Sequence, residues 1–470
     1  MARTFARRRF LQALGGGATA ALVAACAGGA PGPAPSGGGA SGSGAASGAA
    51  PVAATSAPKA AEKAASVPAA VATGTGTFWF NQPPQQEAFQ KIVERFHQAQ
   101  AGVKLEVVLV PGNDVPAKLA TSIAGGEPPD AVRLGGPATN ALFIANGHAA
   151  ALDDWDPKIG TYDWLPGAQK AVTRNGKMHA MPVNSGVQAL IYNKDVYQKA
   201  GLDPEKPPAT LDQLLEVAEK ISAGGGGQVW GHYTLSAPNS QTGSDYFPTI
   251  LWAYGGKEVS DDGTKIAFNS PEGVAALQWY KSLIDRKGMP VKQVNEILML
   301  QDYLTGNVGS MGVFPAVVAR VAGASFKSGS AKLPSGPKGQ VAPLGFGTIM
   351  VMDKAKNRDV GWAFARFIGL EAANGAFWNI SFGQLPPRLS FREDPGWKAY
   401  EAENPLLPAY LEAQKSTDLP YFGPGAQEIG TEVGKAIEAV VFGQKAPQQA
   451  LEEAARAGQV ILDRERQKAG

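Results

Sequence analysis

The chain has 470 residues, of which 44% are hydrophobic and 18% charged, and its net charge is +2. This balance excludes a polybasic nucleic-acid-binding protein, and the single cysteine excludes a disulfide framework or a cysteine-based metal site. Residues 27–75 contain only nine residues other than Gly, Ala, Ser and Pro, which is too little apolar surface to offset chain entropy. About 395 residues remain, which predicts two folded lobes, because single cores stop growing beyond about 250–300 residues.

The amino terminus has the features of an export signal. Residues 1–26 combine a basic start with a weakly apolar Gly/Ala-rich stretch and contain no acidic residue. Residues 7–11 (RRRFL) resemble a twin-arginine signal, and a general secretory signal with an extra arginine is the alternative. Residues 23–26 (VAAC) resemble a lipobox, in which the cysteine is acylated. We therefore predict Cys26 as a lipid anchor and residues 27–75 as a disordered tether.

Strand and helix patterns alternate at the start of the folded part. The predicted strands cover residues 77–80, 104–110 and 129–134, and helical patterns cover 89–96 and 115–123. This order predicts an α/β fold with a parallel sheet and right-handed crossovers. Ligands of such sheets collect at the carboxyl ends of the strands.

Further helices follow along the chain. Thr210 and Gln213 form a capping box that opens a helix, and residues 224–227, all glycine, end it. Ser270 and Pro271 begin another helix, and residues 359–380 and 430–466 are also predicted to be helical.

No pattern indicates catalysis. The four histidines are far apart and none belongs to an HExxH motif, and neither GxSxG nor GxxxxGK[ST] occurs. The GxGxxG match at residues 37–42 lies in the predicted tether. Adjacent acidic pairs such as Asp153 and Asp154 are typical of solvated turns. We therefore expect neither an enzyme nor a cofactor or metal site.

Several motifs carry a resemblance to a known family. They are residues 176–182 (GKMHAMP), 184–185 (NS), 190–195 (LIYNKD) and 200–204 (AGLDP), with shorter pieces at 118–130, 268–273, 309–311 and 383–386. In this order the chain resembles the sugar-type extracellular solute-binding proteins of ABC importers, including the maltose and glycerol phosphate branch. The resemblance covers about residues 76–390.

The resemblance implies a periplasmic-binding-protein fold with two lobes, each a mainly parallel sheet flanked by helices. We expect residues 76–185 and 309–352 in the N-terminal lobe, and 186–308 and 353–470 in the C-terminal lobe. Hinge crossovers are expected near residues 184–187, 305–313 and 352–354. The protein would then be a monomer, lipid-anchored at the outer face of the cytoplasmic membrane. It would close around a solute and present it to the membrane subunits of an ABC transporter.

Sugars pair apolar faces with hydroxyl rims, so their sites combine aromatic rings with amide and charged side chains. Trp79, Trp279 and Trp362 lie in strand or helix patterns and are expected in the core. The predicted ligand-binding residues follow strand ends or loops, or match positions that the family brings to the cleft: Asn81, Gln82, Asn113, Asp114, Gly135, Gly136, Asn184, Ser185, Asp245, Tyr246, Trp252, Phe314, Gly345, Gly347, Gln384 and Arg388. For Tyr246 and Trp252 the alternative is a place in the core, and for the others it is a capping or turn role.

Other functions remain open at this point. The same fold could bind a glycerol phosphate ester or another small anionic solute, for which Arg388 and Arg133 are the candidate cations. A lipid-anchored enzyme acting on glycans would instead need two carboxylates about 5–10 Å apart across a cleft. A sensor that presents its ligand to a receptor would share all of these sequence features.

Overall fold

The computed structural model describes residues 72–82 and 85–469. The predicted export signal, Cys26 and most of the predicted tether lie outside these residues. Strand β1 (Gly74–Phe80) includes the last two residues of the predicted tether. None of the helices in the described part of the chain is long and apolar enough to cross a membrane.

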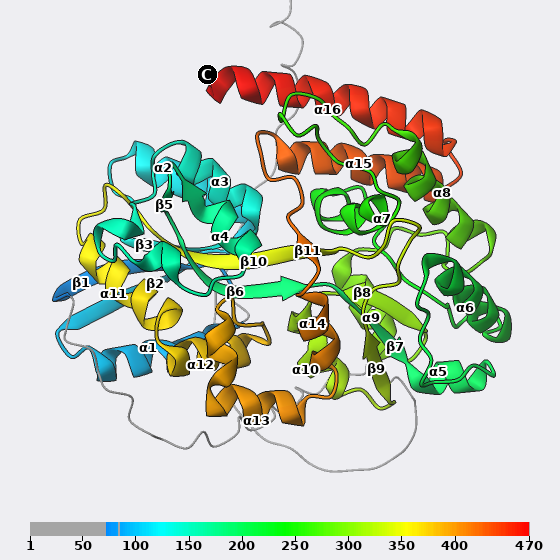
Figure 1. The fold of residues 1–470 in the computed structure, drawn as a ribbon, viewed down its shortest axis with the longest axis horizontal. Coiled ribbons are helices and arrows are strands. Elements are labelled where there is room, and N and C mark those ends of the chain that lie inside the picture. The colour runs from blue at the N-terminus through cyan, green and yellow to red at the C-terminus, as the bar shows by residue number, and fades with distance from the viewer. Residues whose placement is uncertain (1–71, 83–84, 470) are drawn as a thin grey trace, which may run out of the picture. The chain divides into compact units, whose positions relative to one another are not determined.

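The larger of two main sheets has six strands (Figure 1). β1 pairs in parallel with β2 (Val103–Leu109) and β3 (Ala131–Gly135), as the strand and helix order predicted. β10 (Ala342–Val351) runs antiparallel to both β3 and β6 (Met181–Val187), and the short β11 (Thr417–Asp418) extends the sheet beside β10. β10 therefore lies between β3 and β6, with the carboxyl end of β3 beside it and β1 on the other side of β3.

Helices cover this sheet where apolar side chains recur with helical spacing. They are α1 (Gln86–Ala99), α2 (Val115–Ala124), α3 (Pro137–Ala145), α4 (Pro166–Val172), α11 (Arg358–Gly369) and α12 (Ala372–Phe382), and the hairpin β4 (Thr173–Arg174) and β5 (Lys177–Met178) follows α4. Phe89 of α1 stacks on Phe80 of β1 at 4.0 Å between ring centroids, and Phe96 meets Phe364 of α11 edge-on at 5.1 Å. The helical face predicted for residues 89–96 is thus part of the core.

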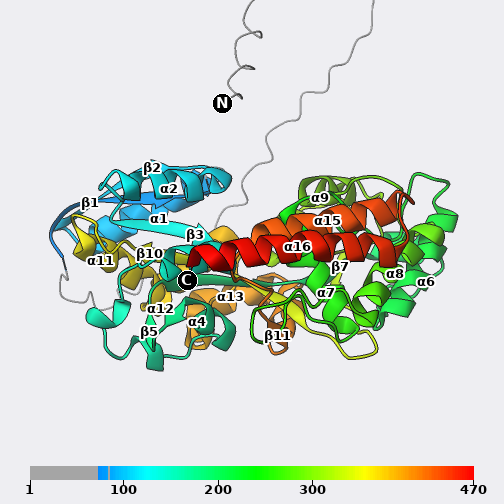
Figure 2. The same ribbon diagram turned by 90° about the horizontal axis from the view of Figure 1, so that it is seen from above.

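The smaller sheet has β7 (Ala189–Asn193) between β8 (Ser310–Val313) and β9 (Ser328–Ala331), and all three strands pair antiparallel. The expected mainly parallel arrangement therefore describes β1, β2 and β3 but not these strands. The remaining helices are α5 (Lys194–Lys199), α6 (Leu211–Gly224), α7 (Phe247–Ala253), α8 (Pro271–Asp285), α9 (Glu296–Leu304), α10 (Val318–Ala322), α13 (Pro395–Glu403), α14 (Leu407–Ala413), α15 (Ala426–Val441) and α16 (Pro447–Ala469). Figure 2 shows α15 and α16 lying along each other and reaching α8, against which both pack.

The predicted helix starts have the caps that their sequences indicate. The hydroxyl of Thr210 accepts a hydrogen bond from the backbone N–H of Gln213 at 3.2 Å, and that of Ser270 accepts one from Gly273 at 3.2 Å. The tryptophans expected in the core are placed accordingly, since Trp279 and Trp362 are buried and Trp79 is partly buried against the core.

The predicted lobe boundaries need correction after residue 308. β8 and β9 pair with β7 in the smaller sheet, so residues 310–331 do not belong with the first lobe, and the second crossing lies within residues 332–341 between β9 and β10. α11 and α12 pack on β1, β6 and β10 of the larger sheet, so the chain does not leave the first lobe near residues 352–354. Pairing between strands that are far apart in the sequence depends on the tertiary structure, and the residues of a strand do not by themselves specify its partner. The first crossing, expected near residues 184–187, follows β6 at Gln188.

Candidate functional site

Four glycines share one face of the larger sheet near the first crossing. In the strand register, Gly347 lies opposite Gly135 of β3 and Asn184 of β6, and Gly345 lies opposite Gly186. Side chains alternate along a strand, so these directly paired positions face the same side. We call Gly135, Gly186, Gly345 and Gly347 the glycine floor. Because these residues have no side chains, other groups can approach the backbone there.

A buried arginine lies on this face. Arg133 precedes Gly135 by two residues on β3 and is 3% exposed. Its Nη1 donates to Oδ1 of Asn81 at 2.6 Å, and its Nη2 donates to Oδ1 of Asn184 at 3.2 Å. Its Nε is buried without a hydrogen-bond partner among the described residues. Burial lowers the pKa of Arg133 to about 10, so the group remains a cation at neutral pH.

The ring of Phe314 packs over the end of the glycine floor that contains Gly186 and Gly345. A Cβ atom at Gly345 would lie 3.3 Å from Cε1 of Phe314, and one at Gly186 would lie 3.4 Å from both Cδ1 of Phe314 and Oε1 of Gln384. The ring of Tyr246 meets that of Phe314 edge-on at 6.3 Å between centroids. Phe314 and Gln384 are half-buried and so reach solvent, whereas Tyr246 is buried behind Phe314.

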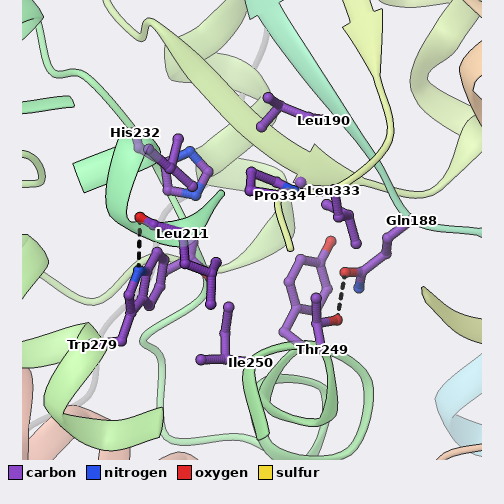
Figure 3. A pocket seen from close by; sticks show the side chains of 13 residues that line it. Gln188, Leu190, Leu211, His232, Thr249, Ile250, Trp279, Leu333 and Pro334 are labelled. Carbon is purple, nitrogen blue, oxygen red and sulfur yellow. Dashed lines mark hydrogen bonds between the residues drawn. The ribbon is translucent and has the colours of Figure 1, made fainter. Parts of the chain in front are cut away.

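Gln188, at the crossing itself, ties the two sheets to a π-helical segment, Thr242–Tyr246. Its Nε2 donates to the backbone oxygen of Asp245 at 3.0 Å, and its Oε1 accepts from the hydroxyl of Thr249 at 3.1 Å (Figure 3). Burial, with a smaller contribution from the charge of Glu296, raises the pKa of the half-buried Asp245 to about 7. The charge of Asp245 is therefore sensitive to pH near neutrality.

Gln188 and Tyr246 also line a small cavity of about 30 Å³ inside the second lobe (Figure 3). His232 borders it, with its Nδ1 3.0 Å from the hydroxyl of Ser310, and the indole of Trp279 donates to the backbone oxygen of Leu211. Burial lowers the pKa of His232 to about 3, so the imidazole is neutral. A cavity of this size has room for water but not for a sugar, so it belongs to the packing of the lobe.

Other predicted ligand residues have local structural roles or lie apart from this cluster. Gly136 has a φ of +74° at the start of α3, and its N–H donates to Phe346 in β10. Ser185 is fully buried, where its hydroxyl donates to the backbone oxygen of Leu385 and accepts from Gln414. Asp114 is exposed and faces Lys118 at 3.6 Å. Gln82 is half-buried after β1, and the side chain of Asn113 lies outside the described part of the structure.

Trp252 and Arg388 bind partners within the protein. The indole of Trp252 donates to the half-buried carboxylate of Glu258 at 2.7 Å. The guanidinium of Arg388 bonds Asp163 at 2.8 Å and lies over the rings of Tyr162, Trp164 and Phe391. Both side chains are held by intramolecular contacts, so the structure does not support the predicted ligand role of either one.

Sequence reasoning underrated Arg133 and passed over Gly186, Gln188 and Glu296. One signal was available for Arg133, because a charged residue inside the apolar strand of residues 131–134 must be buried against something that accepts its hydrogen bonds. The other three become visible only through the pairing of β6 with β10 and the contact of Gln188 with Asp245. Within the described residues, no group of three His, Cys, Asp or Glu side chains could hold a metal ion.

The comparisons with known proteins agree with this architecture. The family model for bacterial extracellular solute-binding proteins matches residues 81–375. A binding protein of Brucella abortus (strain 2308) is 25% identical over 80% of this chain and 89% of its own. The sn-glycerol-3-phosphate-binding periplasmic protein UgpB of Escherichia coli (strain K12) is 27% identical over 62% of this chain and 69% of its own.

The solved structures give the same result. The cyclic alpha-maltosyl-1,6-maltose binding protein of Arthrobacter globiformis superimposes with a TM-score of 0.73 at 25% identity, covering 83% of this chain and all of that one. These relatives are binding proteins and not enzymes. A binding protein of this kind needs two lobes and a polar site between them. In this chain Gln188 joins the two lobes, and the glycine floor lies at their junction. The chain belongs to the family of bacterial extracellular solute-binding proteins.

Proposed function

We propose that this protein captures a carbohydrate by closure of its two lobes and delivers it to the permease of an ABC importer. The observation that carries the proposal is the glycine floor at the junction of the sheets, flanked by the ring of Phe314 and by the amides of Asn81, Asn184 and Gln384. A sugar presents an apolar face to an aromatic ring and hydroxyls to amide groups. The name of the Arthrobacter globiformis relative, a binder of a cyclic maltose derivative, supports this ligand class.

The site suggests how binding would couple to closure. Phe314 follows β8 of the smaller sheet, whereas Asn81 and Asn184 belong to the larger one. A ligand that contacts both sets of residues stabilises the closed arrangement relative to an open one. Closure also removes water from the polar contacts, which makes them selective. The permease would then recognise the closed form.

We further propose that Cys26 anchors the protein at the outer face of the membrane. The support is the VAAC sequence of residues 23–26 and the Gly/Ala/Ser/Pro composition of the 49 residues that follow. A flexible tether of this length has a root-mean-square span of roughly 40 Å. Cys26→Ser, expressed in its native host, should remain an uncleaved precursor or be released. Identical mature masses without acyl chains in both proteins would contradict the anchor.

The carbohydrate proposal is tested by a thermal-shift screen of mono- and oligosaccharides, followed by calorimetry on the best ligand. Phe314→Ala should weaken its binding tenfold or more, because the half-exposed ring provides the stacking surface. Phe442→Ala is the matched control, since Phe442 is a 40% exposed phenylalanine at the end of α15, away from the site. Equal losses for both variants, or stabilisation only by another ligand class, would contradict the proposal.

A second candidate is a glycerol phosphate ester, and one observation favours it. Arg133 is a buried cation on the glycine-floor face, and no carboxylate of the described residues lies within ion-pair distance of it. The name of the Escherichia coli relative, an sn-glycerol-3-phosphate-binding protein, is consistent with an anionic ligand.

A further inference from the structure

The hydrogen bonds of Arg133 determine which way two amide groups face. A guanidinium has five N–H donors and no acceptor, so each neighbouring asparagine must turn its oxygen toward it. Both contacts are made by Oδ1, from Asn81 and from Asn184. The Nδ2 groups of the two asparagines must therefore point away from Arg133. The arginine thus acts as a positioning residue for two N–H₂ donors.

These two donors are available to a ligand. Neither Nδ2 donates to an acceptor among the described residues, and Asn81 is half-buried whereas Asn184 is 5% exposed. Nδ2 of Asn81 lies 3.9 Å from the position of a Cβ at Gly135, beside the glycine floor. At the carboxyl end of β3, Asn81 and Asn184 therefore present two amide N–H₂ groups with a guanidinium behind them.

The charge of Arg133 has no counter-ion in this part of the protein. Three partly buried arginines have one: Arg388 bonds Asp163, Arg366 lies 3.6 Å from Glu371, and Arg358 lies 3.4 Å from Asp353. The partly buried Arg95 and Arg392 bond amide oxygens, as Arg133 does, but neither of them lies on the glycine-floor face. A buried charge without a partner is costly, and removing one partner of a buried pair usually costs several kcal/mol. A bound anion would supply the missing negative charge.

We propose that Arg133, Asn81 and Asn184 form an oxyanion subsite, so that the solute is a hydroxylated compound carrying a phosphate ester or a carboxylate. This inference rests on the proposed function and specifies its ligand. The oxyanion accepts hydrogen bonds from the two amides at the glycine floor, and its charge is balanced by the guanidinium. The hydroxylated part of the solute extends toward Phe314 and Gln384.

The test compares matched neutral and anionic probes by calorimetry on the full chain. The pairs are glycerol with sn-glycerol 3-phosphate, and glucose with both glucose 1-phosphate and glucuronate, with inorganic phosphate measured separately. We expect at least one anionic probe to bind tenfold or more tightly than its neutral partner. The phosphate and carboxylate members of the glucose set tell the two oxyanions apart.

One isosteric variant tests the subsite directly. Asn184→Asp places a carboxylate against Arg133 without changing the volume of the side chain, so it supplies the missing counter-ion and repels a second anion. It should lower the affinity for the anionic probe thirtyfold or more while leaving the melting temperature near that of the wild type. Asn146→Asp is the control, because it adds the same charge at an exposed position at the end of α3. If Asn184→Asp does not fold, Asn81→Asp at its half-exposed position makes the same change.

Three results would overturn the inference. If neutral sugars bind and their anionic partners do not, the oxyanion subsite is wrong while the carbohydrate proposal stands. If no probe of either kind binds, both proposals are wrong. If Asn184→Asp and Asn81→Asp retain the preference for the anion, Arg133 has only a structural role in holding the strand ends.

Discussion

Two arginines, Arg133 and Arg388, were the candidate cations of the sequence, and their surroundings differ in a way that separates structure from binding. Arg388 bonds Asp163 and lies over three aromatic rings, so its charge and its flat faces are both used within the protein. Arg133 is more deeply buried, yet it meets only two amide oxygens and no carboxylate of the described residues. The charge of Arg133 is therefore not balanced by any carboxylate of the described residues, whereas that of Arg388 is.

The comparison extends to the rest of each neighbourhood. Near Arg388, the carboxylate oxygens of Asp163 also accept hydrogen bonds from the backbone N–H and the hydroxyl of Ser390. These bonds hold the loop that contains Asp163 against the segment after α12. Around Arg133 the residues of the glycine floor have no side chains. The Nδ2 groups of Asn81 and Asn184 donate to no acceptor among the described residues. One region is a closed network and the other is a site with unused hydrogen-bonding capacity.

Removing Arg388 from its network with Asp163 and Ser390 should have the largest effect on stability. Arg388→Met removes an ion pair and leaves Asp163 half-buried without its cation, which should cost about 3 kcal/mol of unfolding free energy in urea titrations. Ligand affinity in the folded protein should not change. Arg320→Met, at an exposed position of α10, is the control and should cost little. A loss of affinity with Arg388→Met would return this residue to the binding site.

Trp252→Phe should cost less, about 2 kcal/mol, because it removes one donor from Glu258 and keeps most of the apolar contact. Glu258 is half-buried, desolvation raises its pKa, and its other oxygen still accepts from the backbone of Tyr421. Melting temperature and calorimetry together distinguish the roles of Trp252. A tenfold loss of affinity without a loss of stability would show a ligand contact.

Substitutions in the glycine floor should act on binding more than on folding. A Cβ at Gly347 would come within 2.4 Å of Oδ1 of Asn184 and 3.0 Å of Nη2 of Arg133, whereas one at Gly135 meets its nearest atom at 3.9 Å. Gly347→Ala should therefore weaken ligand binding about tenfold, or about 1.4 kcal/mol. Gly135→Ala is the matched control for loss of a glycine and should change affinity less. If Gly347→Ala and Gly135→Ala weaken binding equally, the position of the Asn184 amide does not determine the affinity.

The last prediction concerns Asp245, whose effect is the smallest when it is taken per pH unit. The folded state raises the pKa of Asp245 to about 7, so it holds a proton that the unfolded chain releases near pH 4. Stability should therefore fall as pH rises from about 4 to about 7, by less than about 1 kcal/mol per pH unit because the residue is partly exposed.

Asp245→Asn should remove this decline, so that the variant gains stability relative to the wild type between pH 5 and pH 8. Urea titrations at both pH values measure the difference. The control is Asp212→Asn at an exposed position in the first turn of α6, which should leave the pH profile as it is. A wild-type profile unaffected by Asp245→Asn would show that this carboxylate is already ionised at pH 5.

Local sequence determined many of the elements, although residues 359–380 and 430–466, each predicted to be helical, each contain a break between two helices. The apolar spacing of α1, the caps at Thr210 and Ser270, and the parallel pairing of β1 with β2 and β3 follow from patterns within short segments. These features depend on neighbours in the chain, so propensity and periodicity are enough to predict them. The motif around residues 176–195 indicated the family for the same reason.

Tertiary structure alone decided which candidates meet. Asn81, Asn184, Gly345, Gly347, Phe314 and Gln384 come together only because β10 lies between β3 and β6 and because β8 pairs with β7 across more than a hundred residues. The tertiary structure also places Arg133 against the amide oxygens of Asn81 and Asn184, and Arg388 against the carboxylate of Asp163. The side chain of an arginine has the same chemistry in both places, so its role depends on the partners that distant segments bring to it. No local pattern records those partners, because the free energy of a buried charge depends on what surrounds it in space.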